Sequence, residues 1–180
     1  MSVKKSAAEI PTIDVNLVTI LPAGATDEIG FETASKIKVE VQSEEEKAVK
    51  LVIKGKLKAQ KPAVTTITGN QITMTDNVFN PELVTILQGG TIHYDTVDTT
   101  KITGYDPPVA GSSDKGETFT LNCYSAQYDG SGAIVQYEKI SYPNCTGVPV
   151  AFGSEDGEFR APEYTINSAP KTGEPQYLAP

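Results

Sequence analysis

The sequence predicts a mainly β fold, a β-sandwich or barrel with one short flanking α-helix and an extended arm at each end. Apolar and polar residues alternate along several stretches, which is the period of strands with one buried face. Glycine, proline and aspartate separate these stretches at turn-like positions. Apolar residues fall at helical spacing in one place, residues 80–88. Many short strands with frequent turns are typical of sandwiches and barrels.

The chain divides into an N-terminal arm of residues 1–12, a β domain of residues 13–167 and a C-terminal arm of residues 168–180. A length of 180 residues suits one such domain. The first arm is mixed in polarity and lacks periodicity, so we expect it to be loose unless a neighbour holds it. Residues 13–21 alternate as a strand, and a turn follows at residues 22–27.

Two stretches that contain lysines, residues 36–42 and 51–59, alternate cleanly between apolar and polar side chains. They are predicted to be long antiparallel strands joined by the charged loop Ser43–Lys50. A further set of strands is predicted over residues 63–75, with a turn at Gly69–Asn70.

The helix is predicted over residues 80–88 from its two ends. Asn80 suits the N-cap and Pro81 suits the first helical position. Gly89 suits the position after the last turn. Three apolar side chains lie at helical spacing between them: Leu83, Ile86 and Leu87. We expect this helix to place one apolar face on a sheet.

After the helix, residues 91–97 are predicted to form a strand and residues 98–116 a long loop rich in glycine and proline. Residues 117–128 and 133–142 alternate again and should pair as a hairpin, with the turn at residues 129–132.

Two more strands are predicted over residues 148–152 and 158–166. The C-terminal tail carries prolines at intervals, so it cannot be a central strand and is expected to be an extended arm.

The formal net charge of −8 is unevenly distributed: residues 1–61 hold ten lysines and nine acidic residues, whereas residues 62–180 hold five basic and fourteen acidic residues. Nucleic-acid binding needs lysine and arginine to replace phosphate counterions, so the acidic remainder argues against it. The acidic charge does not argue against a protein that lets DNA pass without binding it. No apolar run approaches the roughly 20 residues that span a bilayer. Residues 1–11 lack the apolar core of a signal peptide, so we expect synthesis in the cytoplasm.

No combination of residues points to catalysis, a cofactor or a metal site. His93 is the only histidine, and its strand-like context favours a structural role. Cys123 and Cys145 cannot complete a structural zinc site, which takes four ligands. They are expected to be small buried apolar residues, and a pair formed later in an extracellular particle is left open. Nucleotide-binding and nucleophile-elbow motifs are absent, so an enzyme is the least expected class.

Four lysines in residues 50–58 leave three interpretations open: Lys50, Lys54, Lys56 and Lys58. They could protect an edge strand, meet an acidic patch on another copy of the chain, or bind nucleic acid. The first two interpretations are favoured, because no aromatic residues are interleaved and three successive glutamates lie nearby.

Two parts of the sequence resemble bacteriophage major tail proteins, the subunits of the tail tube. The first runs from Ile67 to Gly90 and includes Phe79-Asn80-Pro81-Glu82-Leu83 and then Leu87-Gln88-Gly89-Gly90. The second runs from Phe159 to Ile166 and is followed by Ala169-Pro170 and a short tail that ends in proline. The similarity extends over most of the chain.

The resemblance implies a β-sandwich with one flanking helix that assembles into rings, expected to be hexameric, around a hollow conduit for DNA. The inner sheets of the copies would join into a continuous barrel, and rings would stack through both arms and the charged hairpin. Contacts between copies are accordingly expected at Ser43, Glu44, Glu45, Glu46, Lys47 and Lys50, and at Lys4 and Lys5. A lumen lined with carboxylates would repel DNA phosphates over roughly 8–10 Å.

The expected partners are further copies of the chain, a tape measure protein inside the lumen, the tail terminator, baseplate or distal tail proteins and, in a contractile tail, a sheath protein. The expected location is the tail of the virion, with no membrane. One alternative is a tail terminator, baseplate ring or contractile-bacteriocin tube protein of the same fold. Another is a carbohydrate-binding or adhesin β-sandwich, against which the absence of tryptophan argues.

Overall fold

The computed structural model describes residues 12–111, 116–151, 153, 156 and 161–179, and this part of the chain is mainly β, as predicted. Its strands in chain order are β1 Thr12–Pro22, β2 Ile29–Phe31, β3 Ala34–Glu46, β4 Val49–Ile53, β5 Lys56–Lys61, β6 Val64–Asp76, β7 Thr91–Tyr94, β8 Ile102–Asp106, β9 Phe119–Tyr128, β10 Ile134–Gly147 and β11 Glu163–Ser168. The described residues contain one helix, α1, at Pro81–Gln88.

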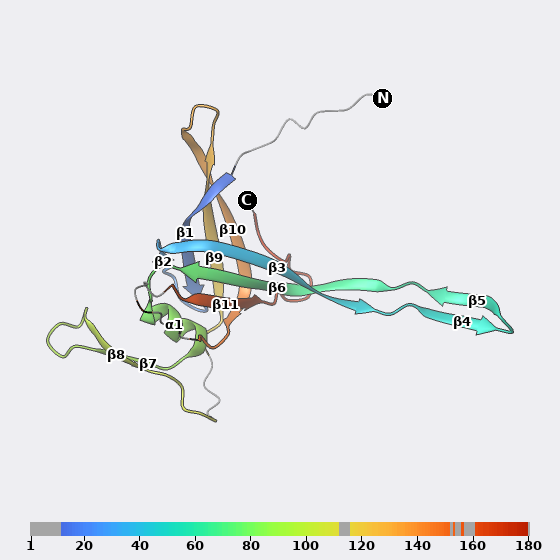
Figure 1. The fold of residues 1–180 in the computed structure, drawn as a ribbon, viewed down its shortest axis with the longest axis horizontal. Coiled ribbons are helices and arrows are strands. Elements are labelled where there is room, and N and C mark those ends of the chain that lie inside the picture. The colour runs from blue at the N-terminus through green and yellow to red at the C-terminus, as the bar shows by residue number, and fades with distance from the viewer. Residues whose placement is uncertain (1–11, 112–115, 152, 154–155, 157–160, 180) are drawn as a thin grey trace.

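Seven of the strands form a single antiparallel sheet in the order β2-β1-β9-β10-β11-β6-β3. Two separate hairpins, β4–β5 and β7–β8, complete the described strands. The large sheet is bent, since β1, β9 and β10 run up the page in Figure 1 whereas β3, β6 and β11 run across it. Seven of the described strands thus belong to one hydrogen-bonded sheet whose two halves cross.

The bend is located in β10, the strand that both halves share. Its first part pairs with β9, and its last residues, Cys145–Gly147, pair with β11. The register with β9 slips between Tyr142 and Cys145, and Asn144 in this interval has a positive φ of 48°. Such a bulge disrupts the ladder locally and bends the strand, and asparagine tolerates the left-handed conformation better than most residues.

One hydrophobic core lies inside the bend and includes α1. Each half of the sheet contributes fully buried side chains, Val18 and Leu121 from one half and Ile72 and Ile166 from the other. The helix adds four more buried side chains: Leu83, Val84, Ile86 and Leu87. The two halves and the helix are therefore held together by the same buried surface.

The helix begins and ends at the residues that the sequence predicts. The Oδ1 atom of Asn80 accepts hydrogen bonds from the backbone N–H groups of Glu82, at 3.0 Å, and Leu83, at 3.3 Å. Gly89 has a positive φ of 81° and donates its N–H to the carbonyl of Thr85. Both ends thereby satisfy backbone groups that a helix terminus leaves without an intrahelical partner.

The pairing predicted for residues 36–42 and 51–59 is wrong. Instead, β3 pairs with β6, and residues 51–59 are divided between β4 and β5 by a turn at Lys54–Gly55. Both turn residues have positive φ, 49° and 75°, as a type I′ hairpin turn requires. The sequence did not indicate this turn, because Lys54 continues the alternation of lysines and because lysine rarely adopts the left-handed conformation.

The turn predicted at Gly69–Asn70 is also wrong, because β6 continues through both residues. A Cβ atom added to Gly69 would lie 2.2 Å from the carbonyl oxygen of Ser168, the last residue of β11. Glycine is needed here because the backbone of β11 approaches closely. A glycine within a strand can therefore indicate close backbone approach and not a turn.

Predictions for the second half of the chain are partly confirmed. The hairpin of residues 117–128 and 133–142 is formed by β9 and β10. The long loop predicted over residues 98–116 is wrong at Ile102–Asp106, which forms β8 and pairs with β7.

The last two predicted strands need correction as well. Residues 148–151 form no strand, since Pro149 has no N–H to give to a ladder, and residue 152 lies outside the described residues. The strand predicted from residue 158 begins at Glu163, and residues 158–160 lie outside the described residues.

Candidate assembly surfaces

The most exposed part of the fold is a long ribbon, residues 38–68, which we call the arm. It consists of most of β3, the β4–β5 hairpin and the first part of β6, and every one of its residues is exposed. Figure 1 shows the arm extending far to the right of the rest of the molecule, which we call the body. No other described element covers it.

Large apolar side chains on the arm are exposed to solvent. Val49, Leu51 and Ile53 alternate along β4 and therefore point to one face, where their exposed fractions are 62%, 53% and 48%. An isolated two-stranded hairpin is at best marginally stable in water, because it has no core of its own. The arm therefore has the features of a surface that becomes buried against a partner.

The contact residues predicted from the sequence lie along the arm and not at its tip. Ser43–Glu46 forms the end of β3 and pairs with β6, and Lys47 follows it. Lys50 lies in β4 opposite Gln60. The expectation of a hairpin tip at Ser43–Lys50 is wrong, because the tip is Lys54–Gly55. Lys4 and Lys5 lie outside the described residues, and the contacts themselves stay a prediction.

Several strand edges have no hydrogen-bonded neighbour among the described strands, and two long ones lie in different halves of the bent sheet. One is the outer edge of β3, the last strand in the sheet order. The other is the edge of β10 at residues 134–140, which lies beyond the three positions where β10 pairs with β11. Each half of the bent sheet thus offers one long edge for pairing with another strand.

The C-terminal segment lies against the body next to this second edge. Ser141 and Leu178 exchange two backbone hydrogen bonds, of 2.8 and 2.9 Å. The rings of Tyr142 and Tyr177 lie 6.1 Å apart. The C-terminal segment that was predicted to be extended, residues 168–180, therefore contacts the body at Leu178. The sequence contains no local signal for this contact.

A polar network covers the outer face of β1, β9 and β10. Thr19 donates a hydrogen bond to the carboxylate of Glu28, and Asn122 donates to the Thr19 hydroxyl at 3.2 Å. Lys139 reaches the same carboxylate at 3.4 Å and lies over the ring of Tyr124. The hydrogen bond from Thr19, followed by the charge of Lys139, holds the pKa of Glu28 below its ordinary value. This network fixes the β1–β2 turn to the sheet.

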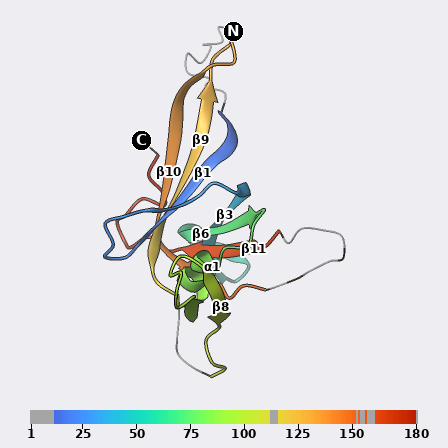
Figure 2. The ribbon, with the colours of Figure 1, turned by 90° about the vertical axis from the view of Figure 1, so that its left-hand side faces the viewer.

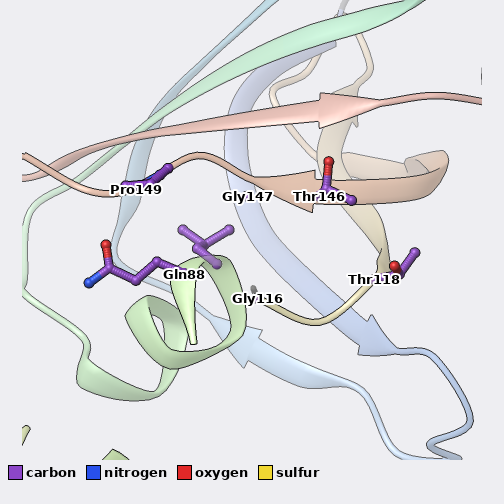
Figure 3. A pocket seen from close by; sticks show the side chains of 7 residues that line it. Gln88, Gly116, Thr118, Thr146, Gly147 and Pro149 are labelled. Atoms are coloured by element: carbon purple, nitrogen blue, oxygen red, sulfur yellow. The ribbon is translucent and has the colours of Figure 1, made fainter. Parts of the chain in front are cut away.

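A cavity of about 340 Å³ lies at the C-terminal end of α1 (Figure 3). Its polar side chains are Gln88, Thr118 and Thr146, and the other lining residues are apolar or glycine. Gln88 is already engaged, because it donates to the hydroxyl of Tyr105 at 2.9 Å and accepts from the N–H of Val150 at 2.8 Å. None of the described residues that line the cavity has an ionisable side chain.

The single histidine lies on the exposed β7–β8 hairpin, where its Nε2 atom is 2.7 Å from a carboxylate oxygen of Asp106. Among the described residues, no group of three or more His, Cys, Asp or Glu side chains is placed to hold a metal ion. No helix in the described part of the chain is long and apolar enough to cross a membrane.

The two cysteines are buried and free, as the sequence predicts. Burial raises the pKa of Cys123 to about 12 and that of Cys145 to about 11, so both stay protonated and unreactive. Cys145 pairs with Phe119, four residues from Cys123 along β9. Four strand residues span roughly 13 Å and adjacent strands lie about 5 Å apart, so the two Cα atoms are separated by about 8 Å or more. A disulfide, which needs less than about 7 Å, would require the strands to move.

No model of a known protein family matches this chain, and no curated protein matches it either.

Proposed function

We propose that the chain is a structural subunit of a bacteriophage tail tube, which assembles as stacked rings into a hollow conduit for DNA. The arm is the observation that carries the proposal. Its residues 38–68 are mostly strand yet exposed on both faces, and this arrangement gains its stability when a neighbouring copy buries the apolar side chains. The resemblance of residues 67–90 to tail tube proteins supports the same assignment.

The two free edges support a ring. A copy that pairs the β3 edge of one molecule with the β10 edge of the next uses two unlike surfaces, which is a heterologous contact. Heterologous contacts form a closed ring when the rotation between copies closes. Closure would pair both of these edges, as closure of a sheet does in β-barrels.

The charge of the chain supports a conduit that does not retain its cargo. With a net charge of −8, the subunit has few cations to replace the counterions of DNA. Carboxylates that face a lumen would repel phosphates over a Debye length of roughly 8–10 Å. DNA would then pass along the conduit without binding to the wall.

Electron microscopy of the purified full chain over a range of concentrations tests the proposal. We expect hollow tubes, or rings that stack as the concentration rises, and a sedimentation coefficient that grows with concentration. Closed rings that never stack would assign the chain to the terminator or baseplate alternative. A compact monomer at every concentration would overturn the proposal, and binding of that monomer to a glycan array would favour the carbohydrate-binding alternative.

A further inference from the structure

The free edge of β10 ends at a contact with the C-terminal segment. Residues 169–179, which we call the strap, follow β11, and their end lies beside β10 on the side away from β9 (Figures 1 and 2). Ser141 donates its N–H to the carbonyl of Leu178 at 2.8 Å, and Leu178 donates its own N–H back at 2.9 Å. The strap therefore closes one end of the edge that residues 134–140 leave open.

The strap shortens the part of this edge that another strand can use. Backbone groups along a strand face its two neighbours alternately, and no register shift interrupts β10 between Gln136 and Tyr142. Because both groups of Ser141 face the strap, those of Lys139 and Tyr137 face the same side. An added strand can bond to these two residues, but it cannot continue to Ser141 while the strap is in place.

Prolines confine the strap to this single pair. Two residues beyond Ser141 along β10 is Pro143, which has no N–H to donate to the strap. Two residues beyond Leu178 is Pro180, which has no N–H to give to β10. The carbonyl of Gln176 accepts instead from Nδ2 of Asn70, at 3.3 Å. The contact therefore does not extend into a ladder like those inside the sheet.

Polar contacts with little buried apolar surface hold the strap. The carboxylate of Glu174 accepts a hydrogen bond from Nδ2 of Asn144, at 3.1 Å. None of residues 171–179 is buried, and Tyr177 and Leu178 are 49% and 56% exposed. Segments with so few buried apolar contacts open at a small cost in free energy, whereas core strands open only with the whole domain.

We infer that the strap is an intramolecular inhibitor of edge pairing, which holds the Ser141 position of β10 in the free subunit and leaves when a strand of another copy pairs there. This inference rests on the proposed function, in which β10 pairs with a neighbouring copy, and it adds the control of that step. The strap and the incoming strand compete for the same N–H and carbonyl groups of Ser141. The apparent affinity between copies is accordingly scaled by the fraction of molecules whose strap is open.

The first test opens the strap. Leu178→Pro removes the N–H that Leu178 donates to the carbonyl of Ser141. We expect this variant to form rings at a concentration about three- to tenfold below that of the wild type, as measured by sedimentation and electron microscopy. The matched control is Leu178→Ala, which keeps the N–H and shortens a side chain that is already half exposed. It should assemble like the wild type.

The second test closes the strap reversibly with a disulfide. Ser141→Cys with Leu178→Cys places two thiols at a hydrogen-bonded antiparallel pair, whose Cα atoms lie about 5.5 Å apart, within the range that a disulfide spans. Oxidised glutathione takes up the two electrons, and burial keeps Cys123 and Cys145 out of the reaction. The oxidised variant should stay monomeric, and reduction with dithiothreitol should restore its assembly.

Hydrogen exchange at the amide of Ser141 separates inhibition from any other role of the strap. In the Leu178→Pro monomer this amide should exchange faster than in the wild type, because the strap no longer covers it. In the assembled variant it should be protected again, because a strand of another copy has taken the position of Leu178.

Three results would overturn the inference while rings of the wild type preserve the proposed function. The oxidised variant could assemble like the wild type, Leu178→Pro could need the same concentration or a higher one, or the Ser141 amide could stay unprotected in the assembled variant. Failure of the proposed function looks different, since the wild type then forms no rings. If Leu178→Pro forms none either, the inference is overturned as well.

Discussion

The body and the arm share the same sequence period but differ in what covers their strands. In the body, residues such as Val18 and Ile20 of β1 are fully buried against the core. In the arm, Val49 and Leu51 of β4 keep more than half of their surface exposed. Alternation therefore identifies a strand without telling whether its apolar face meets the chain's own core or another molecule.

The largest expected difference between the two regions is the cost of removing a leucine. Leu121→Ala in β9 deletes a side chain with 0% exposure, which should lower the free energy of unfolding by about 2–5 kcal/mol. Leu51→Ala in β4, at 53% exposure, should change it by less than about 0.5 kcal/mol in the monomer. Urea unfolding at low protein concentration measures both values.

In an assembly assay, Leu51→Ala should have the larger effect of the two variants. Leu51→Ala should weaken association, because the side chain belongs to the apolar face of the arm. Equal destabilisation of the monomer by both substitutions would mean that the arm folds back on the body in solution, and it would remove the contrast between the regions.

The second prediction concerns close backbone contact, which Gly147 of β10 makes and Gly130 in the β9–β10 turn does not. A Cβ atom added at Gly147 would lie 2.4 Å from the Cα atom of Leu87, so Gly147→Ala should cost about 1–3 kcal/mol in the free energy of unfolding. Gly130→Ala in the β9–β10 turn meets no atom within 4 Å and is the matched control. Thermal unfolding of both variants measures the difference, and a neutral Gly147→Ala would show that α1 moves away from β10 at no cost.

The third prediction tests how strongly α1 is fixed by its N-cap. Asn80→Ala removes the acceptor for the N–H groups of Glu82 and Leu83, and it should lower the free energy of unfolding by about 1 kcal/mol. Asn77→Ala, at an exposed position just before the helix, serves as the control. Chemical unfolding compares the two, and an equal effect at both positions would contradict the role of the cap.

Local signals predicted the elements that are determined locally. The N-cap at Asn80, the glycine at position 89 and the turn after Tyr128 each act within a few residues, and these elements were predicted correctly. The pairing of β3 with β6 was not, because the strands are separated by a second hairpin and no sequence period specifies which strand is the neighbour. Strand β2 has three residues, too few for alternation to be recognised.

The sequence predicted a candidate surface only where charged residues are clustered. The glutamates and lysines at residues 44–50 drew attention to the arm, but the turn at Lys54–Gly55 was not recognised. The contact of Lys139 with Glu28 joins residues 111 positions apart, and the pairing of Ser141 with Leu178 depends on the path of the tail. Such contacts are set by the completed fold, and a single sequence contains no pattern that identifies them.

The smallest expected effect lies in the polar network of the body. Because the pKa of Glu28 is lower in the folded protein than its ordinary value of 4.5, the carboxylate stabilises the fold above that pH, and the contribution is lost as the pH falls through the folded pKa. Glu28→Gln should lower the free energy of unfolding at pH 7 by less than about 1 kcal/mol, since the group is partly screened by solvent. Asp27→Asn removes the same charge one residue away and is the control.

Free energies of unfolding measured from pH 7 down to pH 3 test the direction of the pKa shift of Glu28. The gap between the wild type and Glu28→Gln should narrow as the pH falls below 4.5, because the protonated Glu28 and the neutral glutamine are then alike in charge. A gap that stays constant with pH would assign the effect to the shape of the side chain. A gap that widens in acid would contradict the direction of the pKa shift, and with it the idea that the hydrogen bond from Thr19 and the charge of Lys139 hold the β1–β2 turn in place.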